Sequence, residues 1–173
     1  MKRLFILLSF FALMGLNCQA QIQNKIYDFV LGQTTKDEVK NYFNGRPEIE
    51  IEEEKTGVIS AIGLTFGGCY WDVTFFDFYE DTFMTVYFSA IDTEEVSIAE
   101  INSNFEKLKR SLNKKYASYL LAENSNDENL VYFDGNIMLG LKIGYENGKR
   151  NLTLHYQEGK LSLKRMNSEE TEL

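Results

Sequence analysis

The sequence has very few of the residues that metal sites and nucleophilic catalysis rely on. It contains one histidine, His155, and two cysteines, Cys18 and Cys69. One histidine among scattered acids is too little for a metal site, which wants at least three converging ligands. Only Cys69 follows residue 20, so neither an intrachain disulfide nor a paired-cysteine motif is expected. We therefore predict no metal, no cofactor and no catalytic residues, with Cys69 as a buried structural thiol.

Positive charge and long apolar runs are scarce as well. The formal net charge is −8 at pH 7, and no basic cluster is dense enough to follow a phosphate backbone. Nucleic acid is therefore not expected as a partner. No apolar run after residue 16 approaches the length of a membrane span, so no transmembrane helix is expected there. A chain of 173 residues suits one domain, or two small halves around a shared core.

The start of the chain has the pattern of a bacterial secretory signal peptide. Lys2 and Arg3 form a short basic region, and residues 4–16 are apolar with one exception. Cys18 and Ala20 place small residues at the two positions that signal peptidase reads. The pattern predicts export to the periplasm or beyond it, with cleavage after Ala20.

Cys18 also raises the alternative of a lipid anchor. A bacterial lipobox wants a small residue just before the cysteine and an aliphatic residue three before it. Asn17 and Gly15 occupy those positions. We therefore favour a freely exported chain over one that is lipidated at Cys18.

The rest of the sequence predicts a helix followed by four strands, twice in succession. In the first half, Thr35 and Glu38 form a capping box, and the apolar spacing predicts a helix that ends at residues 44–47. Alternation and turn residues then predict strands at 48–52, 58–66, 71–79 and 82–88.

The second half begins with the longest predicted helix, over residues 98–119. Acids lie at its front and basic residues toward its end, as the helix dipole favours. Tight turns at Asp134-Gly135 and Asn147-Gly148 predict hairpins. The predicted strands are 130–133, 137–146, 149–156 and 161–164.

Residues 71–88 and 137–156 repeat one apolar pattern, which we interpret as an internal duplication. With Tyr79 aligned to Tyr145, Val73, Phe75, Met84, Val86 and Phe88 fall on Leu139, Leu141, Leu152, Leu154 and Tyr156. The predicted fold class is α+β: two sequential halves, each a helix followed by about four antiparallel strands (αβ4αβ4), with the helix on one face of the sheet. The predicted domains are a signal peptide at 1–20, a first half at 21–92, a second half at 93–165 and a disordered tail at 166–173.

A short motif in the first helix resembles a known envelope family. Residues 32–39 read Gly-Gln-Thr-Thr-Lys-Asp-Glu-Val, and Gly-Arg-Pro follows at 45–47. The motif resembles the helix of the SmpA/OmlA (BamE-like) envelope lipoproteins, and the tandem layout is similar to that of the β-lactamase inhibitor protein. Members of both groups bind other proteins and catalyse nothing. The resemblance therefore implies a non-catalytic, envelope-associated binding protein.

The two hairpins differ on the side opposite their shared apolar positions. With Glu80-Asp81 as the turn, strict alternation makes that side aromatic in the first hairpin, whereas the second has Gly140, Lys142 and His155 there. Four aromatic side chains at ~150–250 Å² each amount to roughly 600–1,000 Å², more than a monomer usually leaves exposed. Either the rest of the chain covers this side, or a protein partner or a second copy binds it. The candidate binding residues are Phe76, Phe78, Phe83 and Tyr87, flanked by Trp71 and Tyr70.

Two other functions are compatible with the sequence. A small glycan- or peptide-processing enzyme would use acids near Trp71, such as Asp72 and Asp77, with the indole as a sugar platform. A carrier would hold a small apolar molecule in a cleft between the two half-sheets. A Cys69–His155 nucleophile and base is conceivable, but no orienting Asn or Asp stands near either residue in a recognisable motif.

The acidic run at residues 48–54 also has two interpretations. Its glutamates would attract a basic partner or loosely held Ca²⁺, or they belong to a solvated edge strand whose charge blocks unwanted pairing. The leading hypothesis is an exported, non-catalytic α+β protein that binds an unidentified protein partner, or a second copy, through a sheet face.

Overall fold

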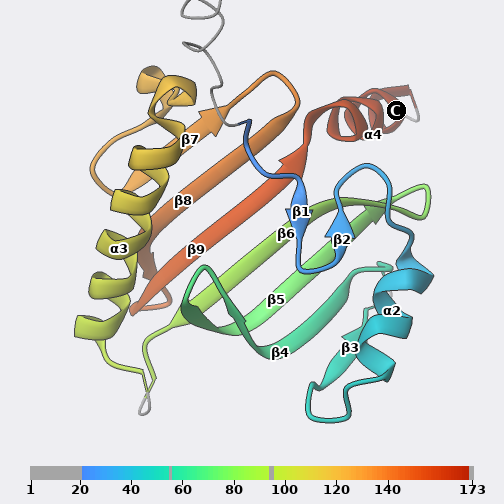
Figure 1. Cartoon of the computed structure of the whole chain (residues 1–173), viewed down its shortest axis with the longest axis horizontal. Coiled ribbons are helices and arrows are strands. Elements are labelled where there is room, and N and C mark those ends of the chain that lie inside the picture. The colour runs from blue at the N-terminus through green and yellow to red at the C-terminus, as the bar shows by residue number, and fades with distance from the viewer. Residues whose placement is uncertain (1–20, 55, 94–95, 172–173) are drawn as a thin grey trace, which may run out of the picture.

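The computed structural model describes residues 21–54, 56–93 and 96–171 of the chain (Figure 1). The predicted signal peptide and the lipid-anchor position Cys18 lie outside these residues. Among the helices that are described, none is long and apolar enough to cross a membrane.

In the described part of the chain, seven strands form one antiparallel sheet, and the two predicted halves share it (Figure 1). The strands lie in the order β3-β4-β5-β6-β9-β8-β7. Their bounds are β3 Ile51–Glu53, β4 Ile59–Phe66, β5 Cys69–Tyr79, β6 Thr82–Ile91, β7 Asn129–Phe133, β8 Ile137–Glu146 and β9 Lys149–Glu158. β6 and β9 pair from Thr85 opposite Gln157 to Ile91 opposite Asn151, which joins the two hairpins. The predicted fold of two sequential helix-plus-four-strand halves is therefore wrong.

The second half lacks its predicted fourth strand. Residues 161–164, and residues 166–171 of the tail that was predicted as disordered, instead belong to helix α4, Gly159–Thr171. β9 already pairs with β6 on one side and β8 on the other, so a strand that followed it could not form a hairpin with β9. The Glu158 carboxylate accepts a hydrogen bond from the Leu161 N–H at 2.6 Å and caps the start of the helix.

Both predicted helices are present. α2, Lys36–Asn44, begins with the capping box: the Thr35 N–H donates to Glu38 Oε2 at 2.8 Å, and the Glu38 N–H donates to Thr35 Oγ1 at 3.3 Å. α3, Ile98–Tyr116, is N-capped by Ser97 and buries its predicted apolar stripe, Ile101, Phe105, Leu108, Leu112 and Tyr116. The chain then reaches β7 through two short 3-10 helices, η1 Ala117–Tyr119 and η2 Ala122–Asn124.

α2, α3 and an N-terminal hairpin cover one side of the sheet, which we call the inner face (Figure 1). The hairpin consists of β1, Lys25–Ile26, and β2, Phe29–Val30. The Phe29 ring centroid lies 5.7 Å from that of Phe76 on β5 and 5.8 Å from that of Phe43 on α2. The hairpin thus fills the space between α2 and the sheet.

α4 lies against one end of the opposite side, which we call the outer face. Arg165 Nη1 lies 2.8 Å from Asp77 Oδ2 on β5, and Gln157 Nε2 on β9 donates to Ser162 Oγ at 2.8 Å. Both contacts are polar, in contrast to the apolar packing on the inner face. No other helix in the described part of the chain packs on the outer face.

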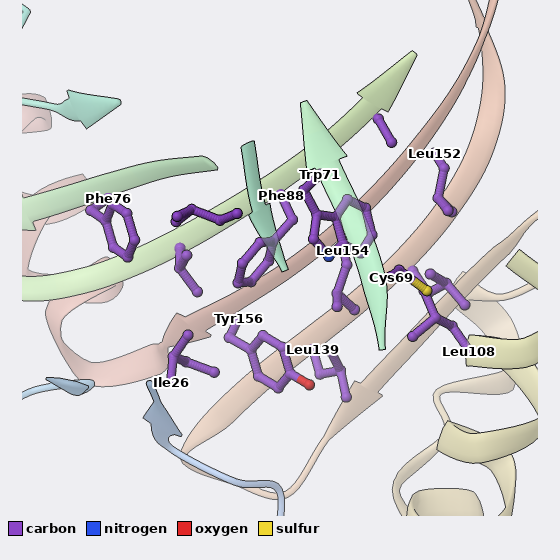
Figure 2. Close-up of a cluster of buried hydrophobic side chains, with 14 of the residues drawn as sticks. Ile26, Cys69, Trp71, Phe76, Phe88, Leu108, Leu139, Leu152, Leu154 and Tyr156 are labelled. Carbon is purple, nitrogen blue, oxygen red and sulfur yellow. The ribbon is translucent and has the colours of Figure 1, made fainter. Parts of the chain in front are cut away.

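Figure 2 shows the core between the inner face and the elements that cover it. Trp71 on β5 and Tyr156 on β9 lie in one cluster with Leu108 of α3 and Ile26 of β1. Trp71 is fully buried, and its Nε1–H donates to the Phe66 carbonyl at 3.0 Å. The apolar sides of both hairpins therefore contribute to a single core.

A change of alternation in the first hairpin decides which of its side chains face the core. Gly63 in β4 has a φ of +73°, a conformation that interrupts a regular strand. In the paired β5, Trp71 and Thr74 both face inward, so the alternation shifts by one residue. Phe76 therefore points into the core and Phe75 to the outer face. The predicted faces of these two residues are exchanged.

A β-bulge is the second irregularity of this hairpin. Asp77 lies opposite Thr85, but Phe78 lies opposite Phe83, so Met84 is an extra residue in β6. The bulge turns Phe83 toward the core, where it is fully buried.

Candidate functional site

A row of three rings crosses the middle of the outer face. Phe75 on β5, Tyr87 on β6 and His155 on β9 are successive cross-strand partners, and we call them the aromatic row. The Tyr87 ring centroid lies 6.5 Å from that of Phe75 and 6.4 Å from that of His155. The Tyr87 and His155 rings are within 18° of parallel. Tyr87 is 38% exposed, so the centre of the row is open to solvent.

His155 keeps its position because its neighbour on β8 has no side chain. Gly140 is its cross-strand partner, and a Cβ atom there would lie 2.0 Å from His155 Cε1. The imidazole therefore lies over bare backbone. Burial lowers the pKa of His155 below its ordinary value, so the ring is neutral at pH 7. The aromatic row thus ends in an uncharged, flat ring.

Two depressions lie on either side of Tyr87. The polar depression, of about 310 Å³, is lined by Tyr87, Lys142, Gly144, Tyr145, Glu146, Asn151 and Thr153. The acidic depression, of about 370 Å³, is lined by Glu54, Val58, Phe75, Asp77, Thr85 and Tyr87. Because Tyr87 belongs to both walls, it is the ridge between them.

The polar depression is held in shape by hydrogen bonds among its own side chains. Asn151 Nδ2 donates to Glu146 Oε2 at 2.6 Å, and Ser89 Oγ donates to Asn151 Oδ1 at 3.5 Å. The guanidinium carbon of Arg150 lies 4.9 Å from the centre of the Tyr145 ring. The amide of Asn151 is therefore already occupied, and the exposed cation of Lys142 is the group this depression offers to a partner.

The acidic depression has two carboxylates in different states. Asp77 is paired with Arg165 of α4. Glu54 is exposed and makes no salt bridge with any residue that the structure describes. The Thr85 hydroxyl is buried and has no hydrogen-bond partner within the described residues. One carboxylate of this depression is thus neutralised by the chain itself, and one remains available.

The six predicted binding residues do not form one surface. Trp71, Phe76 and Phe83 are fully buried in the core under the inner face. Phe78 is half-buried beside the bulge. The shift in β5 moves Phe76, and the bulge in β6 moves Phe83, to the side opposite Tyr87.

Tyr87 and Tyr70 are the predicted binding residues that lie on the surface. Tyr87 stands at the centre of the aromatic row, whereas Tyr70, 49% exposed, lies beyond the irregularity in β4. A Cβ on Gly63 would lie 3.1 Å from the Tyr70 hydroxyl, so the Tyr70 side chain leans across that glycine. The two tyrosines therefore belong to separate parts of the surface.

Phe75 was predicted on the apolar core side and so was missed as a member of the candidate site, whereas His155 was expected on the opposite side but not as part of an aromatic row. A glycine inside a strand indicates a bulge or a bend, so Gly63 is the signal that could have warned against strict alternation. Gly140 is likewise a glycine inside a strand, which indicates close approach of another group, and the structure shows that His155 is what approaches it.

The described residues do not have the geometry that the catalytic alternatives require. Cys69 is buried in the core, beside Leu108 in Figure 2, whereas His155 is on the outer face, so the two cannot act as nucleophile and base. Burial raises the pKa of the Cys69 thiol and keeps it protonated. No group of three His, Cys, Asp or Glu side chains that could hold a metal is found among the residues described.

No protein-family model, curated protein or solved structure matches this chain. The resemblance to BamE-like proteins and to the β-lactamase inhibitor protein therefore stays a prediction.

Proposed function

We propose that the protein is a non-catalytic module that binds a protein partner on the open part of its outer face, centred on Tyr87. One observation carries this proposal: an aromatic side chain is exposed between two depressions, on a side of the sheet that α2, α3 and the N-terminal hairpin leave open. Tyrosine is enriched at the energetic centres of protein interfaces, because it offers a large rigid ring with a polar end.

The shape of this surface favours a protein over a small molecule. Small-molecule sites are concave and enclose most of their ligand, whereas here the ring of Tyr87 divides the surface into two open depressions. The cross-strand line from Ser60 through the aromatic row to Gly140 spans five strands, which lie in the order β4, β5, β6, β9 and β8. A surface of that breadth suits the ~800 Å² that each partner contributes to a standard interface.

The predicted export signal at residues 1–20 supports a partner in the bacterial envelope or outside the cell. The motif at residues 32–47 supports the same setting, because the BamE-like proteins it resembles are envelope proteins. A second copy of this chain is the other candidate partner. Sedimentation of the purified protein distinguishes the two, since self-association through this face would make a dimer that Tyr87→Ser dissociates.

Neither of the other two functions is favoured by a particular observation. Trp71 is buried and cannot stack on a sugar, and the Asp72 carboxylate accepts the Ile91 N–H at 2.7 Å. These residues serve the fold. The carrier needs a cleft between two half-sheets, but β6 and β9 join those half-sheets edge to edge.

The proposal is tested by replacing Tyr87 with serine and measuring how much partner is recovered with the tagged full chain from its own cells. We expect the loss of this ring to weaken the complex by about tenfold or more, as truncation of an interface anchor does. Tyr70→Ser is the matched control, because it removes a tyrosine of at least the same exposure from another part of the surface. Equal recovery by the Tyr87→Ser variant and the unmodified chain would overturn the proposal.

A further inference from the structure

We propose that the acidic depression receives a basic side chain, a lysine or an arginine, of the protein partner. This inference rests on the proposed function and specifies the chemistry of the partner at one point of the interface. The depression combines the rings of Phe75 and Tyr87 with the carboxylates of Glu54 and Asp77. Aromatic faces and carboxylates are the groups that attract an organic cation, through the ring quadrupole and through charge.

The chain itself already places one guanidinium at the rim of this depression. Arg165 Nη1 reaches from α4 to Asp77 Oδ2 at 2.8 Å, and both side chains remain partly exposed. The contact shows that a basic side chain can approach this end of the outer face and pair with its acid. Glu54, on the other side of the depression, has no such partner within the described residues.

The acids of β3 and of the turn after it show a difference between the two faces. Glu53 lies opposite the fully buried Ile59, so it faces the inner side, where Lys36 and Lys40 of α2 both pair with it. Glu52 lies opposite Ser60 and faces the outer side, where Glu54 lines the depression.

These outer acids have no cationic partner among the described residues. Glu50, Glu52 and Glu54 are exposed, and no salt bridge joins them to any residue in the described part of the chain. The chain therefore neutralises Glu53 on its inner face and Asp77 on its outer face, but leaves the outer acids of β3 and its flanking residues unneutralised beside the aromatic row. That charge is complementary to a basic segment of a partner.

A metal ion fits the acidic depression less well than an organic cation. Ca²⁺ takes six to eight oxygen ligands, whereas this depression offers two carboxylates, one of them already paired. The aromatic walls add nothing to the binding of a hard metal ion, but they do add to the binding of an alkylammonium or guanidinium group.

The experiment is an NMR titration of the full chain with the blocked tripeptides Ac-Gly-Arg-Gly-NH2 and Ac-Gly-Lys-Gly-NH2. The uncharged isostere with citrulline in place of arginine is the control peptide. We expect the basic peptides to shift the resonances of Phe75 and Tyr87, and the citrulline peptide to leave them unchanged. Glu54→Gln should weaken binding by about threefold to tenfold, the range of a partly exposed cation contact.

Two further variants make the result decisive. Glu123→Gln removes the same charge from an exposed residue in η2, across the sheet from β3, and should leave the affinity unchanged. Arg165→Gln frees Asp77 from its internal partner and should tighten peptide binding. The inference is overturned if the citrulline peptide shifts the same resonances, if Glu54→Gln and Glu123→Gln have equal effects, or if no peptide shifts them at the highest concentration reached.

This outcome is separable from that of the proposed function. If Tyr87→Ser loses the protein partner while Glu54→Gln keeps it at full affinity, the outer face is a binding surface and the inference about a basic side chain is wrong. If Tyr87→Ser also retains the partner, the proposed function itself is wrong.

Discussion

The two hairpins that meet at the centre of the sheet both bury apolar side chains under the inner face, but their ladders differ. The β8–β9 ladder is continuous from Ile137 opposite Glu158 to Glu146 opposite Lys149. The β5–β6 ladder carries a bulge, and β5 shifts its alternation beside Gly63 of β4. The irregular hairpin is therefore the one that carries an exposed ring on its outer side. The regular hairpin supplies Gly140 and the polar depression beside it.

The turns of the two hairpins also differ in how well their residue types suit the backbone conformation. Asn147 and Gly148 have φ values of +51° and +80°, which suit these residue types. Glu80 and Asp81 adopt +47° and +63°, a left-handed conformation that glutamate adopts at a cost. The first hairpin therefore departs from regular geometry at its turn as well as in its strands.

The largest expected effect tests which of two adjacent phenylalanines faces the core. Phe76→Ala should lower the free energy of unfolding by about 3–5 kcal/mol, because Phe76 is fully buried. Phe75→Ala should lower it by much less, since Phe75 is half-buried on the outer face. Urea unfolding of both variants measures the difference. Strict alternation predicts that Phe75→Ala is the more destabilising of the two. That result would show that β5 does not shift its alternation.

Several elements could be predicted from the sequence because their signals are local. The capping box at Thr35 and Glu38 places the start of α2, and Asn147-Gly148 places a turn. The pairing of β6 with β9 could not be predicted, because no single turn connects the two strands and α3, β7 and β8 lie between them in the sequence. α4 was missed for the same reason, since the pairing of β9 with β6 prevents the residues after β9 from forming a hairpin with it.

The candidate site was only partly predictable, because it depends on two local departures from alternation. Tyr87 was named correctly as a surface residue, since β6 alternates regularly around it. Phe76 and Phe83 were misplaced, because a shift of one residue in β5 and the bulge in β6 move these side chains to the other face. Trp71, expected only at the edge of the site, lies before the shift and faces the core.

The next effect tests the glycine in the irregular hairpin against one in the regular hairpin. Gly63→Ala should destabilise the fold by about 1–2 kcal/mol, because Gly63 has a positive φ. Gly144→Ala should leave stability unchanged or raise it by up to ~1 kcal/mol, since nothing lies within 4 Å of a Cβ there. Thermal and urea unfolding would report both. Equal losses in the two variants would mean that the φ of Gly63 is not a constraint.

A smaller and opposite effect is expected at the first turn. Replacing Glu80-Asp81 with Asn-Gly should stabilise the protein by about 0.5–1 kcal/mol, because those residues adopt left-handed φ values more readily. The Asn147-Gly148 turn of the second hairpin is the reference. Unfolding measurements that found the exchange destabilising would show that Glu80 or Asp81 makes a contribution beyond the turn.

The smallest effect concerns pH and the end of the aromatic row. Burial lowers the folded-state pKa of His155 below 6.5, so between the two values the unfolded chain binds more protons and stability rises with pH. The contribution is complete above about pH 6.5 and is lost as the pH falls below it. Urea unfolding at pH 7.5 and pH 5 should show a larger decrease for the unmodified chain than for His155→Gln. An identical decrease in both would mean that His155 is not buried by its neighbours.

The most direct test of the account is a photo-crosslinking amino acid placed at position 87, with position 70 as the control, in the full chain in its own cells. We predict one discrete covalent adduct from position 87 and none of the same mass from position 70, because Tyr87 lies between the two depressions and Tyr70 does not. An adduct of the same mass from both positions, or none from position 87, would contradict a partner-binding surface centred on Tyr87.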